Sequence, residues 1–413
     1  MKKVLVIAYH FPPCGDVAAQ RAGKFVKYFP KFCWQPVVLT ARYRYRVPHD
    51  PSYSRDIPQG VKVYRVFNPE LTAFLPWRLK SVLDEFFLIP DDKVLWLPFA
   101  VRAGLKIILR EKVDAIFATG NPWTALLVGQ RLKALTKIPL VIDLRDPWTQ
   151  NVNRLWRSEA RYQREIQMES QVLQNADHII TVTEPIKEML MKRYPFTVGK
   201  ITVITNGYDK EDFAKLDQVF QAKDRQRQKM LITNHGSFYG DELIKAFLIA
   251  LQELCKEKPG LKDKIEVKFI GGWGHKMIKN LANQLGLQSI VKVVKYIEHA
   301  ENIKYLMTSD LLLLIRPQKY AYSAKIFEYL ASGKPILALV PTDGVAAALI
   351  RQTNSGLVVE SENIQAIKQA ILHFYELWQQ GNLHFNVNWD IIQQFERSRL
   401  TQQLAQILDQ VTS

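Results

Sequence analysis

The sequence predicts an α/β protein made of two Rossmann-like, doubly wound domains. Strand-like apolar segments alternate with helix-like segments almost from end to end, as in parallel sheets with helical crossovers. The 413 residues are too many for one ordinary hydrophobic core, which favours two domains of about 200 residues each. A turn-prone cluster, Thr205–Asp209, and a polar run, Gln218–Lys229, separate the two series of segments.

The strands expected in the first half are short, apolar and followed by a turn or a helix. They are Lys3–Ala8, Pro36–Thr40, Val61–Val66, Asp114–Ala118, Leu140–Leu144, His178–Thr183 and Lys200–Thr205. A helix from about Ala18 to Phe32 is expected after the first strand. Residues 67–100, rich in proline and aromatic residues, predict an irregular insertion in the first domain.

The second half repeats the alternation and then ends in a helical tail. Its expected strands are Met230–Asn234, Glu266–Ile270, Lys292–Tyr296, Leu311–Ile315, Pro335–Val340 and Leu357–Glu360. We therefore predict a first domain over residues 1–207, a second over 208–385, and a tail over 386–413 that packs back on the first domain.

Charge and cysteine content exclude several classes of protein. The three cysteines are widely spaced, which argues against a disulfide framework or a zinc site and favours a reducing compartment. No apolar run approaches the roughly 20 residues of a membrane span. The net charge of +16 fits either solubility or polyanion binding. Because the bases are interleaved with large apolar residues and no nucleic-acid module is recognisable, we expect an anionic membrane surface and no nucleic acid as partner.

Two first-domain segments follow strands and contain candidate ligand-binding residues. His10–Gly15 lies between the first strand and the first helix, where a binding loop and a plain tight turn are both compatible with the residues. The pattern is not G-x-G-x-x-G, which removes most support for NAD. Asp143–Trp148 places two carboxylates, an arginine and an indole at a strand's carboxyl end, the edge where open α/β sheets bind ligands. Its alternative is an internal Arg–Asp pair that shapes the loop.

The most informative stretch is Ser323–Pro335 in the second domain. It predicts a helix with Ser323 as its N-cap, ended by Gly333. The first amides of that helix, including that of Ala324, and the Lys325 ammonium suit a diphosphate, and Glu328 can accept hydrogen bonds from two ribose hydroxyls. The alternative is a surface Lys–Glu pair.

These residues resemble the nucleotide-sugar motif of the retaining glycosyltransferases of family 4, which have the GT-B fold. The resemblance extends to Phe11–Gly15, Val37–Thr40, Ile89–Asp92, Asp143–Trp148 and Asn206–Asp209, in the family's order. It implies two domains facing across a cleft, with a C-terminal helix crossing back to the first domain.

The resemblance implies retaining, hexosyltransferase-like transfer without a metal or cofactor, from a nucleotide sugar to a lipid-linked or other saccharide. Arg145, Asp146 and Lys325 are assigned to catalysis, none of them as a nucleophile. Donor binding is assigned to the Ser323–Lys325 segment, Glu328, Arg316 and two loop glycines, Gly236 and Gly272. The acceptor side is assigned to His10, Gly15 and Trp148.

The sequence departs from the family pattern at three points. Tyr320 stands where members commonly have a second glutamate, eight positions before Glu328. The loop Gly236–Asp241 lacks the usual cations, whose role Lys325 or Arg316 would take over. The histidine common in the first-domain loop has no clear counterpart, and Arg145-Asp146 occupies its place.

Two other functions remain open, a nucleotide-sugar epimerase and a non-catalytic nucleotide-sugar-binding subunit of a polysaccharide pathway. For the favoured enzyme we expect a cytoplasmic location with peripheral attachment to the inner face of the cytoplasmic membrane. Arg42–Arg46 and the segment Phe74–Lys80 mix cations with aromatic side chains and are the predicted membrane contacts.

Overall fold

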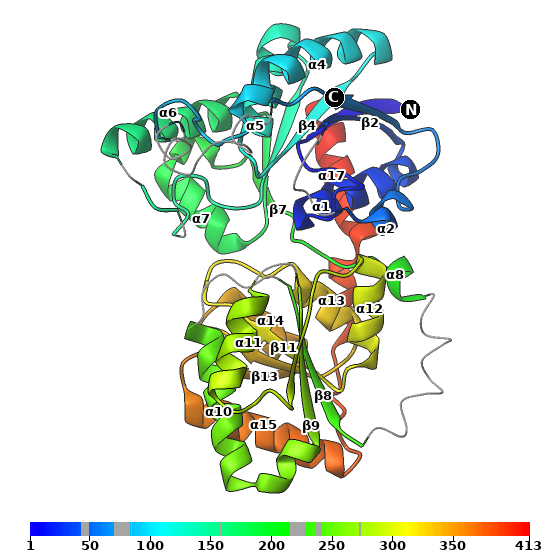
Figure 1. The fold of residues 1–413 in the computed structure, drawn as a ribbon. Helices are drawn as coiled ribbons and strands as arrows, with labels where there is room; N and C mark the ends of the chain where they lie inside the picture. Colours follow the sequence, from blue (N-terminus) through cyan, green and yellow to red (C-terminus); the bar gives the residue numbers. More distant parts are fainter. Residues whose placement is uncertain are drawn as a thin grey trace. The chain divides into compact units, whose positions relative to one another are not determined.

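The computed structural model describes residues 1–42, 49–69, 83, 85–152, 154–156, 158–214, 228–236, 242–271 and 274–413. The chain divides into two compact units. The first unit comprises Met1–Thr205 together with Arg397–Ser413, and the second comprises Asn206–Glu396. Each unit contains one parallel sheet with helices packed on it (Figure 1).

The first unit is built on a seven-stranded sheet in the order β3-β2-β1-β4-β5-β6-β7. Its strands are β1 (Lys2–Ala8), β2 (Trp34–Ala41), β3 (Lys62–Val66), β4 (Ala115–Gly120), β5 (Leu140–Leu144), β6 (His178–Thr181) and β7 (Ile201–Val203). Neighbouring strands are parallel, and β1 pairs with both β2 and β4. The strand order therefore reverses direction between β1 and β4, which is the switch point of a doubly wound sheet.

The helices of the first unit bury an apolar stripe against this sheet. They are α1 (Val17–Tyr28), α2 (Pro51–Ser54), α4 (Leu97–Glu111), α5 (Thr124–Thr136), α6 (Glu159–Asn175), α7 (Glu184–Arg193) and α17 (Arg397–Val411), with 3₁₀ turns at Phe29–Phe32, Val94–Trp96 and Pro195–Thr197. Asp16 caps α1 by accepting a hydrogen bond from the Ala18 amide at 2.8 Å. Among the described residues, no helix is both long enough and apolar enough to cross a bilayer.

The second unit is built on a six-stranded sheet in the order β10-β9-β8-β11-β12-β13. Its strands are β8 (Met230–His235), β9 (Ile265–Ile270), β10 (Val291–Val294), β11 (Leu311–Ile315), β12 (Ile336–Leu339) and β13 (Gly356–Val359). All pairs are parallel, and the switch point lies between β8 and β11. The central strand β11 is five consecutive buried apolar residues, as expected where helices cover both faces.

Helices cover this second sheet as well. They are α8 (Lys210–Ala214), α10 (Glu242–Glu257), α11 (His275–Gln284), α12 (His299–Thr308), α13 (Lys325–Ala331), α14 (Val345–Gln352), α15 (Ile364–Gln379) and α16 (Trp389–Ile392), with 3₁₀ turns at Pro259–Asp263 and Gln393–Phe395. Every strand expected from the sequence has a counterpart within two residues at each end in one of the two sheets. The predicted fold class, two Rossmann-like doubly wound domains, is confirmed.

The C-terminal tail divides between the two units. Helix α17 packs beside α1 in the first unit, and the Trp34 indole donates to Asp409 at 3.2 Å (Figure 1). Residues 386–396, predicted to join the first domain, belong to the second unit instead. The reason is local, since the Asn388 amide donates to the Thr353 carbonyl at 2.8 Å and Ile392 is buried in the second core.

Candidate functional site

The donor-side candidates of the second unit meet at its switch point. Gly236 directly follows β8 and Arg316 directly follows β11, so both lie at the carboxyl edge where open α/β sheets bind ligands. Gly236 has a φ of 111°, a conformation that residues with a Cβ rarely adopt. A Cβ at this position would lie 3.0 Å from the Lys325 Nζ. The ammonium of Lys325 therefore packs directly on the backbone that follows β8.

Lys325 is a partly buried cation close to a second cation. Its Nζ donates to the Asn234 Oδ1 at 3.4 Å, and Asn234 is fixed by a 2.6 Å hydrogen bond from its amide to the Leu313 carbonyl. Burial, and then the positive charge of Arg316, lower the pKa of Lys325 to about 7. Two neighbouring cations that are partly removed from water favour an anion at the same place.

The start of α13 differs from the prediction. The helix begins at Lys325, the capping position is Ala324, and no side chain caps it. Ser323 is therefore not the N-cap, because Ala324 already has helical backbone angles and the Ser323 carbonyl accepts from the Ile326 amide at 3.0 Å. Gly333 follows the helix with a φ of 65°, in agreement with its predicted role in ending it.

Glu328 has a partner that sequence reasoning missed. His299, on α12, places its Nε2 at 2.7 Å from the Glu328 Oε1. The other ring nitrogen, Nδ1, lies 4.0 Å from the Asp212 Oδ2. The Glu328 side chain is 16% exposed, so it is neither buried deep in the core nor on the open surface. The alternative reading of the sequence was a surface pair between Lys325 and Glu328. Instead, the hydrogen bond from His299 on α12 orients the Glu328 carboxylate.

His235, the last residue of β8, was also missed. Its ring is 5% exposed, its backbone amide donates to the Tyr329 hydroxyl at 2.9 Å, and its Nδ1 is hydrogen-bonded to Asn302. Its Nε2 has no hydrogen-bond partner within the described part of the chain. Burial lowers the pKa of His235 to about 4, and the nearby Lys325 charge adds to that effect. The ring is thus neutral near pH 7 and keeps one nitrogen for a ligand or water.

In the first unit, His10 lies after β1, at the switch point with β4. Burial lowers the pKa of His10 to about 4. The negative charge of Asp16 opposes this shift, and the positive charges of Arg145 and Lys93 add to it. Its Nδ1 lies 3.7 Å from the Cys14 sulfur. Gly15 lies between Cys14 and Asp16, the N-cap of α1. An isolated antiparallel β-bridge between the backbones of Cys14 and His49 holds this loop in place.

The Arg145 side chain is hydrogen-bonded to backbone carbonyl groups. Its guanidinium donates to the Gly120 carbonyl and, at 2.7 Å, to the Asn121 carbonyl at the end of β4. Two of its five N–H groups are thus occupied in holding that turn. Burial lowers the pKa of Arg145, opposed by the charges of Asp143 and Asp146. Asp146 is partly exposed on the following loop.

Asp143 pairs inside the unit, as the internal-pair alternative foresaw, but with a different arginine. Arg21 of α1 donates to both Asp143 oxygens, at 3.0 and 2.9 Å, and to the carbonyls of Ile204 and Thr205. Both side chains are at most 1% exposed. The pair fastens α1 to β5 and to the end of β7.

Trp148 is fully buried. The prediction that its side chain lines the acceptor side of the site is therefore wrong. Its indole stacks on Trp123 with ring centroids 5.7 Å apart, and its Nε1 donates to the Glu165 Oε2 at 2.8 Å. Trp148 therefore supports the loop after β5 from the inside.

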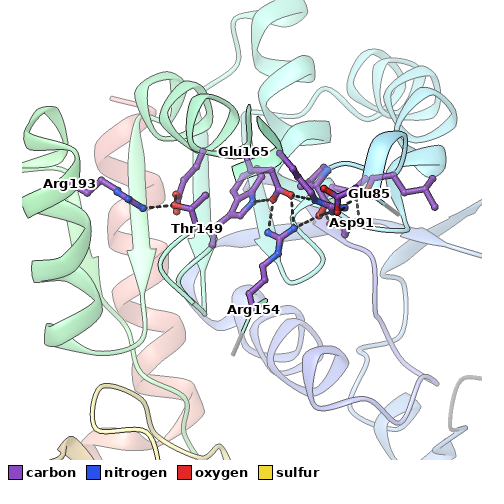
Figure 2. A network of polar contacts seen from close by, with 12 residues as sticks. Glu85, Asp91, Thr149, Arg154, Glu165 and Arg193 are labelled. Atoms are coloured by element: carbon purple, nitrogen blue, oxygen red, sulfur yellow. Dashed lines mark hydrogen bonds and ion pairs between the residues drawn. The ribbon is translucent and has the colours of Figure 1, made fainter. Parts of the chain in front are cut away.

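A network of polar contacts around Glu165 extends that support (Figure 2). Arg154 donates to both Glu165 oxygens, at 2.5 and 2.6 Å, and to the Pro90 carbonyl at 2.8 Å. Arg161 adds a third charged contact, at 2.9 Å, and also faces Glu85. This network ties the loop after β5 to α6 and to the segment before α4.

Parts of two sequence predictions lie outside the described residues. These are Gly272 and residues 237–241 of the predicted donor side, and residues 43–46 and 74–80 of the predicted membrane contacts. Arg42, at the end of β2, is described, and its amide donates to the Val66 carbonyl at 2.7 Å.

Comparison with known proteins gives one consistent family. The profile described as Glycosyltransferase Family 4 matches residues 18–212, and that described as Glycosyl transferases group 1 matches residues 217–384. No curated protein matches the chain. Several solved structures share the fold over nearly the whole chain.

Sucrose-phosphate synthase of Thermosynechococcus elongatus superposes with a TM-score of 0.71 at 16% identity, covering 99% of each chain. HepE of Anabaena, solved in complex with UDP-glucose, has a TM-score of 0.66 at 16% identity and covers 99% of this chain and 100% of its own. A putative UDP-N-acetylglucosamine 2-epimerase of Listeria monocytogenes has a TM-score of 0.54 at 12% identity, covering 98% and 94%. With two consecutive matched profiles on two Rossmann-like units of the GT-B type, this chain belongs to the family 4 glycosyltransferases.

Proposed function

We propose that the protein transfers a hexose-like sugar from a uridine diphosphate sugar, with retention of configuration and without a metal or other cofactor. The observation that carries the donor part is the partly buried pair of Lys325 and Arg316 at the switch point of the second sheet. A diphosphate there receives positive charge from two side chains that have already lost part of their hydration. The UDP and UDP-glucose complexes of HepE support a uridine nucleotide.

Each donor-side residue has a separate part in this proposal. Lys325 and Arg316 bind the diphosphate and stabilise the charge that it gains as the sugar departs. Glu328, oriented by His299, accepts hydrogen bonds from the ribose hydroxyls. Gly236 lets the phosphates approach the backbone, because no Cβ projects there.

The decisive experiment is a thermal-shift screen of uridine, guanosine and adenosine diphosphates, followed by a donor-consumption assay with UDP sugars. A ligand at 100 times its dissociation constant stabilises the folded protein by about 2.7 kcal/mol, a shift that is easily measured. Stabilisation by UDP but not by uridine supports the diphosphate site. Absence of any shift with all three diphosphates contradicts the donor proposal. Retained activity in excess chelator supports the metal-free part.

For the acceptor we propose a lipid-linked saccharide presented at an anionic membrane surface. His10, Gly15 and Asp146 of the first unit are the acceptor-side residues, with Arg145 holding the neighbouring turn. Support comes from the net charge of +16 and from the position of these residues after β1 and β5. Incorporation of labelled sugar into the lipid fraction of a membrane extract, rather than the aqueous fraction, is the expected result.

An epimerase is the first alternative, because a putative epimerase is among the proteins that share this fold. This putative Listeria epimerase has a TM-score of 0.54, below the 0.64 of HepE with UDP and the 0.71 of sucrose-phosphate synthase. Epimerised free donor formed without any acceptor would establish that alternative. Binding of UDP sugar without turnover under all conditions would instead indicate a non-catalytic subunit, to which Tyr320 in place of the family glutamate points.

A further inference from the structure

Helix α4 and the end of α5 present an exposed surface that is basic and apolar at once. On α4, the exposed positions Phe99, Arg102, Lys106, Leu109 and Arg110 recur at helical spacing and so lie along one side of the helix. The end of α5, which packs against α4, adds Arg131 and Leu135. We call these seven residues the basic-apolar face, and both helices are visible in Figure 1.

The basic-apolar face has more positive charge than the acids of its own helices compensate. Residues 97–110 and 124–137 contain six Lys or Arg and no Asp or Glu. The one acid of α4, Glu111 at its end, is buried and engaged by Lys62 and Tyr64, and it also lies 3.8 Å from the Arg110 guanidinium. Within the described part of the chain, Arg102, Lys106 and Arg131 form no ion pair. These cations are therefore available to anions outside the molecule.

Large apolar side chains stand exposed among these cations. Leu109 is 80% exposed, Leu135 is 61% exposed and Phe99 is 41% exposed. Phe99 also makes an edge-to-face contact, 5.1 Å between ring centroids, with Phe67, which is itself exposed. Exposed leucine and phenylalanine at helical spacing lose hydration only if another apolar phase covers them.

A groove runs along the same surface. It has a volume of about 370 Å³, and its lining is apolar apart from two guanidinium groups, Arg102 from α4 and Arg131 from α5. The remaining lining residues are Leu97, Pro98, Val101 and Leu105. An apolar floor with guanidinium groups at its sides matches a phospholipid, whose phosphate lies next to its hydrocarbon chains.

We propose that the basic-apolar face docks on a bilayer of anionic phospholipids, with its cations at the phosphates and with Phe99, Leu109 and Leu135 in the headgroup region. This inference deepens the membrane part of the proposed function by naming the surface in contact. A nucleic acid offers the cations the same phosphates, but its backbone gives the exposed leucines no apolar phase to enter. The observations therefore favour a bilayer.

The test compares vesicle binding of the full chain and of paired variants. Sedimentation with vesicles of phosphatidylcholine alone, and of phosphatidylcholine mixed with phosphatidylglycerol, is measured at physiological ionic strength. The variant Arg102→Glu/Lys106→Glu reverses two charges of the face. The control Lys276→Glu/Lys279→Glu makes the same charge change on exposed positions of α11. Phe99→Ser/Leu109→Ser is compared with Phe196→Ser/Val198→Ser, an exposed aromatic and aliphatic pair elsewhere in the first unit.

Wild type is expected to bind the anionic vesicles and not the neutral ones. Loss of each cation lowers the partition coefficient about five-fold, so the α4 charge variant falls by about 30-fold or more while the α11 control keeps most of its binding. The Phe99/Leu109 variant falls more than its control. Equal losses in variant and control overturn the proposal, as does failure of wild type to bind anionic vesicles.

Two further measurements keep the outcomes distinct. The first is binding of single-stranded RNA by wild type and by the α4 charge variant. If the variant loses RNA binding but keeps vesicle binding, the face binds nucleic acid and the proposal is overturned. The UDP-induced thermal shift is measured in every variant. Because the face lies outside the donor-side residues, an unchanged shift shows that the variants are folded. It also separates failure of membrane docking from failure of the donor proposal.

Discussion

Glu328 of α13 and His299 of α12 form a direct contact, with 2.7 Å between the carboxylate Oε1 and the imidazole Nε2. The two residues belong to different helices, and the histidine is itself 8% exposed. The contact fixes the orientation of the Glu328 carboxylate from a second helix. Under the proposed function this oriented carboxylate is the group that accepts the ribose hydroxyls.

Glu328→Ala is expected to weaken UDP binding by about 2–4 kcal/mol, because two hydrogen bonds to a charged group are lost. Calorimetry with UDP and with its 2′-deoxy analogue checks the cause. Wild type should prefer UDP, and the variant should bind both equally. His299→Gln, which keeps a donor near the carboxylate, serves as the milder companion and should retain more of the preference than His299→Ala. An unchanged UDP affinity in folded Glu328→Ala removes the ribose assignment.

Lys325→Met is expected to reduce the affinity for UDP much more than that for uridine, because only the diphosphate uses the ammonium. The pKa of about 7 also gives wild type a pH dependence. Above pH 7 the free protein loses the Lys325 proton that an anion needs, so UDP affinity should fall as pH rises. The variant should show a flatter profile. Equal losses for uridine and UDP would mean that Lys325 does not contact the phosphates.

The same pKa predicts a stability effect. Lys325 titrates near 7 in the folded protein and near 10.5 when unperturbed. Between these values the unfolded chain holds a proton that the folded protein lacks, so the free energy of unfolding should rise with pH across this window. Urea unfolding at several pH values measures the slope. Lys325→Met should flatten it, and a slope unaffected by the substitution contradicts the assignment.

Gly236→Ala is expected to destabilise the protein by on the order of 1–3 kcal/mol, because its φ of 111° suits only glycine. It should also lower UDP affinity, since the new Cβ would lie 3.0 Å from the Lys325 Nζ and displace the ammonium. Gly286→Ala is the matched control, because Gly286 also has a positive φ, 67°, but open space around it. If both variants bind UDP alike, the contact between Gly236 and Lys325 has no role in binding.

His235 is expected to make the protein labile to acid. Its pKa is about 4 in the folded protein against an ordinary 6.5, so protonation favours the unfolded chain as pH falls through this window. The loss by pH 4 should be on the order of 3 kcal/mol, at 1.36 kcal/mol per pKa unit. His235→Gln should reduce it, and His384→Gln, at an exposed position, is the control. Identical acid limbs in wild type and His235→Gln would sink this prediction.

Asp143→Asn is expected to cost about 3–5 kcal/mol of unfolding free energy, because it leaves the buried guanidinium of Arg21 without its counter-charge. Asp146→Asn, at a partly exposed position in the loop that follows β5, should cost far less. Denaturant unfolding of both variants gives the comparison. Similarly small losses of unfolding free energy in the two variants would show that the Arg21–Asp143 pair does not stabilise the fold.

The sequence by itself determined the two sheets, the family and the donor-side pattern. Short apolar runs bounded by turn residues identify buried parallel strands such as β11 without any tertiary information. A strand that is covered on both faces needs apolar residues at consecutive positions, and this pattern is visible in the sequence. Lys325 and Glu328 could be singled out together because they lie one helical turn apart in the same motif.

The tertiary structure decided which polar groups meet and which side chains reach the surface. His299 meets Glu328 across 29 positions, and Arg21 meets Asp143 across 122, distances over which no local pattern specifies a partner. Trp148 looked like a surface residue on a charged loop, yet stacking on Trp123 and bonding to Glu165 place it inside. Burial and long-range pairing depend on how separate helices and strands pack, and packing is a property of the folded chain rather than of any one segment.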